Sequence, residues 1–180
     1  GIDGMEHGSL MNEETAAMIE ERGIYLVPTF SPYEEAVHYD PERLKDKQPE
    51  FRRKLELYRE ALQAGREVIC HSKIRLGYGT DFVAVHQNYE SGYEYEAWMN
   101  SGMKPFEALK AATSTNAGIL GLEDCIGTVE VGKYADISAW KRDLMKDPKA
   151  LLDCAFVMKE GEIYETESCL GEGGGRSHPF

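Results

Sequence analysis

Hydrophobic and polar positions alternate along the first part of the chain in blocks that predict strands and helices in turn. The apolar run IYLVPTF, residues 24–30, is rich in strand-forming side chains and predicts a buried strand. Before it, EETAAMIEER predicts a short amphipathic helix, with Asn12 as its N-terminal cap and Gly23 as its stop. Residues 2–6 are too short to assign alone, but the order of the blocks makes them the first strand.

The same alternation continues through the middle of the chain. Pro49 predicts the start of a long helix that ends at Gly65. The stretch KIRLGYGTD, residues 73–81, predicts a strand that runs into a glycine-containing turn, and helices are predicted over residues 89–101 and 104–113. Because strands alternate with helices, we expect parallel βα units that form part of a barrel or of an open sheet.

The period of the pattern changes after Gly127. The stretch GTVEVGKYADISAW alternates and turns at Gly132, which predicts a β-hairpin. The stretch CAFVMKEGEIYE repeats this pattern around Gly161. The remaining tail, from Ser168, is rich in glycine and predicts a flexible segment.

The amino-acid composition limits the kinds of partner that this chain is expected to bind. The chain has 180 residues, of which 42% are hydrophobic, and a formal net charge of −12, which argues against nucleic acid or an anionic membrane as a partner. No apolar run approaches the roughly 20 residues of a membrane span. The four cysteines are scattered without a C-x-x-C pair, which favours reduced thiols and a cytoplasmic protein. The chain begins with Gly1 rather than Met, so secretion stays open.

Three βα units leave two strand edges without a neighbour, a situation that folded proteins usually avoid. We therefore expect that the chain self-associates, or that a missing N-terminal half covers these edges.

Two ionisable residues, His7 and Asp81, each follow a predicted strand at a turn that contains glycine. In a βα-barrel the chemistry sits at the carboxyl ends of the strands, and a histidine and an aspartate there can face one divalent metal. The carboxylate can also pass a proton from water to a leaving group. Each residue has an ordinary structural explanation as well, as a hydrogen-bonded histidine and as a turn-forming aspartate.

Three stretches resemble the amidohydrolase superfamily, and within it the imidazolonepropionase-like and Xaa-Pro dipeptidase-like branch. GMEHGSLMNEETAAMIEERGIYLVPTF is similar to the strand-six to strand-seven region, and GYGTDF is similar to the strand-eight aspartate motif. SGMKPFEALKAATSTNAGILGLEDCIGTVEVGKYADISAW is similar to the closing helix and the return into a small β-sandwich. The resemblance covers roughly residues 1–166 and keeps the order of the three motifs.

The resemblance implies an α/β fold that is the C-terminal part of a (β/α)8 TIM barrel, with about three βα units. It places a partial barrel domain over residues 1–121 and a β-sandwich segment over residues 122–167, followed by a flexible tail over residues 168–180.

The resemblance also implies roles for individual residues. His7 is a metal ligand, and Asp81 is both a metal ligand and the proton shuttle. His86 is expected near the substrate. The expected cofactor is a divalent metal, most simply zinc.

The implied activity is hydrolysis of an amide, peptide, lactam or ester bond in a small or dipeptide-like substrate, with metal-activated water attacking the carbonyl. Nothing in the chain matches the strand-one His-x-His pair, the strand-four lysine or the strand-five histidine of the family. Two ligands alone are expected to hold metal weakly. The alternative is a catalytically inactive binding or structural fragment of the same fold. A serine or cysteine hydrolase is disfavoured, because the chain has no G-x-S-x-G motif and no cysteine near a glycine-rich nucleophile turn.

Overall fold

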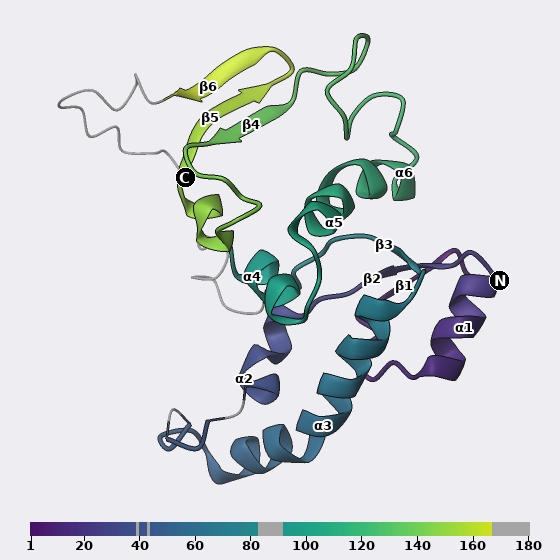
Figure 1. Ribbon diagram of the computed structural model, residues 1–180, viewed down its shortest axis with the longest axis vertical. Helices are drawn as coiled ribbons and strands as arrows, with labels where there is room; N and C mark the ends of the chain where they lie inside the picture. The colour runs from purple at the N-terminus through teal and green to yellow at the C-terminus, as the bar shows by residue number, and fades with distance from the viewer. Residues whose placement is uncertain (39, 43, 83–91, 167–180) are drawn as a thin grey trace.

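The computed structural model describes residues 1–38, 40–42, 44–82 and 92–166 (Figure 1). The predicted substrate residue His86 and the predicted tail over residues 168–180 lie outside these ranges.

The first three strands form a small parallel sheet, as the alternation of strands and helices predicts. They lie in the spatial order β1 (Gly4–Glu6), β2 (Tyr25–Val27) and β3 (Arg75–Leu76). Leu26 on the central strand pairs with Met5 on one side and with Leu76 on the other. The strands are shorter than predicted, because the backbone leaves the ladder after two or three residues.

The helix between the first two strands is α1 (Glu13–Glu21). It begins as predicted, since the Asn12 side chain accepts a hydrogen bond of 2.8 Å from the Thr15 amide. Its buried face consists of Ala16 and Ile19.

The long helix α3 (Pro49–His71) begins at the predicted proline but continues past Gly65, so the predicted stop is wrong. A Cβ atom at Gly65 would lie 2.4 Å from the Ser9 carbonyl oxygen. The glycine is therefore present because the loop after β1 packs directly on the helix backbone, and not because the helix ends there. A 3-10 turn η1 (Ser31–Tyr33) and a short helix α2 (Glu34–Val37) lie between β2 and α3.

The next helical segments cover the sheet. They are α4 (Tyr93–Asn100), α5 (Pro105–Lys110), the π-turn η3 (Ala111–Thr115) and α6 (Asn116–Ile119). Trp98 on α4 is fully buried, with ring centroids 5.9 Å from Phe30 and 5.4 Å from Tyr78. It joins Leu26 and Ile69 in one core cluster, so α4, the sheet and α3 share a hydrophobic core.

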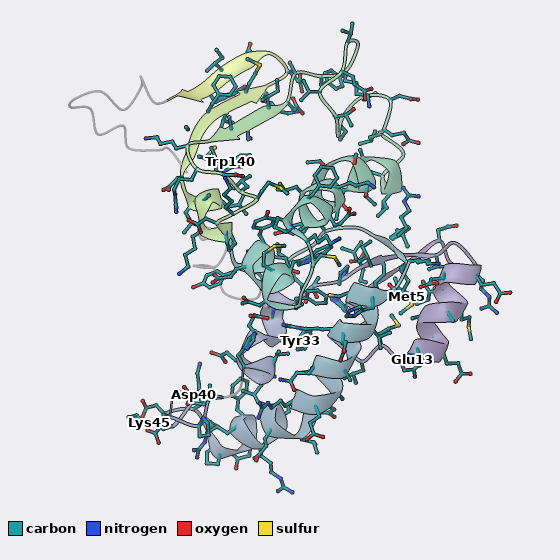
Figure 2. The ribbon with its side chains drawn as sticks, in the orientation of Figure 1. Met5, Glu13, Tyr33, Asp40, Lys45 and Trp140 are labelled. Carbon is teal, nitrogen blue, oxygen red and sulfur yellow. The ribbon has the colours of Figure 1, made fainter. Side chains whose placement is uncertain are left out.

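A second, antiparallel sheet follows the helices. It consists of β4 (Ile137–Trp140), β5 (Cys154–Lys159) and β6 (Glu162–Thr166), with a 3-10 segment η4 (Pro148–Leu152) before β5. Met5 on β1 and Trp140 on β4 mark the two separate sheets in Figure 2. No helix among the described residues is long and apolar enough to cross a membrane.

The hairpin predicted around Gly161 is confirmed by the antiparallel pairing of β5 and β6. The hairpin predicted around Gly132 is wrong, because β4 begins only at Ile137 and pairs with β5. Val129 and Val131 are 81% and 108% exposed. The alternating pattern before Gly132 therefore has no neighbouring strand within the described part of the chain.

Candidate active site

His7 lies at the point where β1 leaves the sheet. Its amide donates a 2.9 Å hydrogen bond to the Val27 carbonyl, which continues the pairing of β1 with β2 by one residue. The chain then turns through left-handed backbone at His7 and Gly8, with φ of 65° and 61°. A Cβ atom at Gly8 would lie 2.9 Å from Leu26 Cδ1, so both the backbone angle and the packing require glycine there.

Asp81 lies at the corresponding place after β3, and the structure brings the two predicted residues together. His7 Nδ1 lies 3.9 Å from Asp81 Oδ2, and both side chains are about half exposed. The pair therefore combines an imidazole and a carboxylate that are open to solvent at the carboxyl end of the parallel sheet. His86, the third predicted residue, is outside the described ranges.

Both residues have unusual backbone angles. His7 (φ 65°) and Asp81 (φ 48°) are left-handed, and among the described non-glycine residues they share this conformation only with Glu160 in the β5–β6 turn. Such a conformation costs about 1–2 kcal/mol per residue and persists where surrounding contacts impose it. Strained residues of this kind cluster at functional sites.

Thr29, which follows β2, completes a row of three strand ends. Its Oγ1 lies 2.9 Å from His7 Nδ1, and the residue is 4% exposed. A hydrogen bond at Nδ1 fixes the orientation of the imidazole and leaves Nε2 for a ligand. Sequence reasoning missed Thr29, which falls at the carboxyl end of the strand predicted over residues 24–30, although the end of a strand is the signal that identified His7 and Asp81.

Two contacts hold the loop that carries Asp81. The Asn116 side chain accepts from the Tyr78 amide and donates to the Tyr78 carbonyl, both at 2.9 Å. The Ser31 hydroxyl donates to the Thr80 carbonyl at 3.2 Å. Gly79 also passes close to the central strand, because a Cβ atom there would lie 2.7 Å from Val27 Cγ1. The loop is thus fixed from α6 and from the chain after β2.

The donor atoms of the pair fit a divalent metal in part. Imidazole nitrogen and carboxylate oxygen are both common zinc ligands, and a protein site usually supplies three or more. The described residues contain no group of three or more histidine, cysteine, aspartate or glutamate side chains placed to hold a metal. The pair can therefore contribute two ligands to a larger set.

Comparison with protein families gives one clear match. The sequence profile described as the amidohydrolase family matches residues 1–166 of this chain. No curated protein sequence matches the chain.

Solved structures with the same fold agree with that match. A Xaa-Pro dipeptidase with methionine bound in its active site is 30% identical and superposes with a TM-score of 0.77, over 92% of this chain and 40% of its own. An amidohydrolase is 26% identical, with a TM-score of 0.75 and the same coverage. The ochratoxinase of A. niger is 24% identical, with a TM-score of 0.73 over 92% of this chain and 37% of its own, and shows the fold alone.

The chain thus spans about two fifths of the length of these solved structures. Over that span, the mixed α/β unit of this chain, a parallel sheet followed by a small antiparallel sheet, superposes on each of them.

Proposed function

Because this chain belongs to the amidohydrolase family, we propose that the whole protein is a metal-dependent hydrolase that cleaves a C–N bond, with an amide or peptide as its first candidate substrate. The observation that carries the proposal is the convergence of His7 and Asp81, from two different strand ends, to 3.9 Å. The likeness to a Xaa-Pro dipeptidase at 30% identity supports a dipeptide-like substrate.

We also propose the finer architecture. Strands β1, β2 and β3 are three adjacent units of a (β/α)8 barrel, and β4–β6 are part of a β-sandwich. The parallel order, the carboxyl-end site and the match over 92% of the chain support this arrangement. Self-association and the domain boundaries expected from the sequence stay predictions.

A divalent metal, with zinc expected, would be held by His7 through a ring nitrogen and by Asp81 through a carboxylate oxygen. The remaining ligands would come from other parts of the whole protein. When bound, the metal lowers the pKa of water and polarises the substrate carbonyl.

Asp81 supplies the proton transfer. As water attacks the carbonyl carbon, the carboxylate of Asp81 takes one proton from it. When the C–N bond breaks, the same carboxyl gives that proton to the leaving nitrogen, so Asp81 ends each cycle ionised. Its side chain is half exposed and therefore open to substrate, and the Ser31 and Asn116 contacts keep its loop in place. Thr29 meanwhile holds the His7 ring.

The test measures hydrolysis of Xaa-Pro dipeptides, N-acyl amino acids, lactams and esters by the whole zinc-loaded protein. We expect Asp81→Asn to lower kcat on the order of 10³-fold, because proton transfer and an anionic ligand are lost together. His7→Ala is expected to weaken zinc binding, with activity partly restored by excess zinc. Titration calorimetry of the 180-residue chain should give zinc binding weaker than micromolar, since two ligands hold the metal poorly.

Asp124→Asn and His71→Ala are matched controls on exposed parts of the chain, and both should keep full activity. Unchanged activity in both Asp81→Asn and His7→Ala would overturn the proposal. Absence of hydrolysis by the zinc-loaded wild-type protein would favour the alternative, a binding or structural protein of the same fold.

A further inference from the structure

One buried acidic side chain holds the chain segment that follows β2. It is Glu94 on α4, which is fully buried. Its Oε1 accepts hydrogen bonds of 2.8 Å from the Phe30 amide and from Trp98 Nε1, and its Oε2 accepts one of 2.8 Å from the Ser31 amide. Three donors therefore converge on one carboxylate.

Burial is the largest influence on Glu94 and raises its pKa, and the hydrogen bonds from Phe30, Ser31 and Trp98 offset that rise only in part. All three groups are donors, and an ionised carboxylate accepts most strongly from such donors. Burying a carboxylate is costly unless it is fully hydrogen-bonded, and this one is placed at the chain segment that follows β2.

The segment bound by Glu94 contacts both halves of the site. Thr29, one residue before Phe30, contacts His7 Nδ1 through its hydroxyl. Ser31, one residue after Phe30, donates through its hydroxyl to the carbonyl of Thr80, which directly precedes Asp81. The buried Arg66 holds the same peptide from the other side, by donating to the Phe30 carbonyl.

We propose that Glu94 is a positioning residue, which fixes the segment Thr29–Ser31 so that His7 and Asp81 are held at a common site. It acts through backbone amides and touches neither residue. The role in catalysis rests on the proposed function, whereas the positioning role concerns the geometry of the chain alone and is measurable without substrate or metal.

The proposal predicts different effects for two conservative substitutions. In Glu94→Gln the amide oxygen can still accept from Phe30 and Trp98, but the NH₂ group then faces the Ser31 amide, donor against donor. Ser31→Ala keeps the backbone amide that donates to Glu94, but removes the hydroxyl, which reaches Thr80 and also contacts Glu94. Thr113→Ala is the matched control, because its exposed hydroxyl donates only to the Leu109 and Lys110 carbonyls of its own helical segment.

The first readout is amide hydrogen exchange of the metal-free chain, followed by mass spectrometry of peptides. We expect Glu94→Gln to speed exchange about tenfold in peptides that cover residues 5–10 and 75–82, and Ser31→Ala to do so only in the second. Peptides from β4 and β5 should exchange as in the wild-type chain, and Thr113→Ala should change neither site peptide.

A uniform rise in exchange along the chain would overturn the proposal, because it would indicate loss of global stability rather than of local positioning. So would unchanged exchange in both site peptides of Glu94→Gln. The second readout is the kinetics of the whole zinc-loaded protein, where Glu94→Gln is expected to lower kcat about tenfold with KM nearly unchanged. If the wild-type protein hydrolyses no substrate, the proposed function fails while the exchange result still decides the positioning role.

Discussion

The strands of the parallel sheet have two or three residues each, whereas those of the antiparallel sheet have four to six. The short strands lie on a core that includes the fully buried side chains of Leu26, Ile69 and Trp98. The described side chains of β4–β6 are half-buried or exposed, and that sheet carries exposed ion pairs such as Lys159 with Asp136.

This difference indicates how the site residues are placed. The β5–β6 hairpin is held by a ladder of backbone hydrogen bonds, because the amides and carbonyls of the two antiparallel strands pair along their length. In the parallel sheet the ladder ends early, and buried or half-buried side chains then hold the backbone at Phe30, Tyr78 and Thr80. The backbone at His7 and Asp81 is thereby free to adopt left-handed angles that a continuing ladder would forbid.

The largest expected effect comes from the two tryptophans, one in each region. Trp98→Ala should lower the free energy of unfolding by about 3–5 kcal/mol, because it removes a fully buried ring that contacts Phe30 and Tyr78. Trp140→Ala should cost about 1–2 kcal/mol, since that ring is half-buried and donates one hydrogen bond, to Leu151. Urea denaturation measures both, and each variant retains the other tryptophan as a fluorescent reporter.

Equal losses in the two variants would contradict the view that burial stabilises one region and the ladder the other. If Trp98→Ala does not fold, Trp98→Phe keeps an aromatic ring and removes the Nε1 hydrogen bond to Glu94 together with part of the buried ring volume. We expect that variant to fold and to lose about 1–3 kcal/mol.

Local chemistry explains what could be predicted from the sequence. The start of α1 follows from Asn12, and the start of α3 follows from Pro49, because caps and proline act within one turn of the chain. The parallel order of the first strands follows from their alternation with helices. His7 and Asp81 could be identified as a pair because strand ends of the same direction meet at one edge.

Tertiary contacts explain what could not be predicted. From the sequence, Gly65 is interpreted as the end of a helix, whereas in the structure it permits close packing of the helix against Ser9. A glycine can serve either role, and only the tertiary structure shows which one applies. The residues before Gly132 have the alternation of a strand without a partner among the described residues. The sequence suggests that Glu94 is an exposed helix residue, because none of its neighbours in the sequence indicates that the chain after β2 packs against it. Left-handed backbone at non-glycine residues has no signal in the sequence either.

A smaller effect is expected from two glycines that lie in helices. Gly65→Ala should lower the free energy of unfolding by about 1–3 kcal/mol, because the new Cβ would meet the backbone of Ser9 at 2.4 Å. Gly118→Ala on α6 should change it by less than about 1 kcal/mol. Its Cβ would meet only the flexible end of Arg75, at 2.7 Å, and alanine favours the helix.

Urea denaturation of both variants distinguishes the two kinds of contact. If Gly65→Ala stabilises the protein, as alanine does in an ordinary helix, then the loop after β1 does not depend on close packing against α3. That result would contradict the view that close tertiary contacts, rather than a long backbone ladder, hold the parallel sheet and its loops.

The smallest expected effect is a pH dependence that originates in the parallel region. Burial raises the pKa of the Cys70 thiol from 9.0 to about 11, an effect that the nearby Arg66 charge partly offsets. The unfolded chain therefore releases this proton above about pH 9, whereas the folded chain keeps it until about pH 11, so stability falls as the pH rises through that window. The loss should be about 1 kcal/mol, since Cys70 is only partly buried and solvent screens the thiolate. Urea denaturation between pH 8 and 11 measures this slope, and Cys70→Ala should reduce it. An identical slope in the variant would show that the thiol is as well hydrated in the folded chain as in the unfolded one.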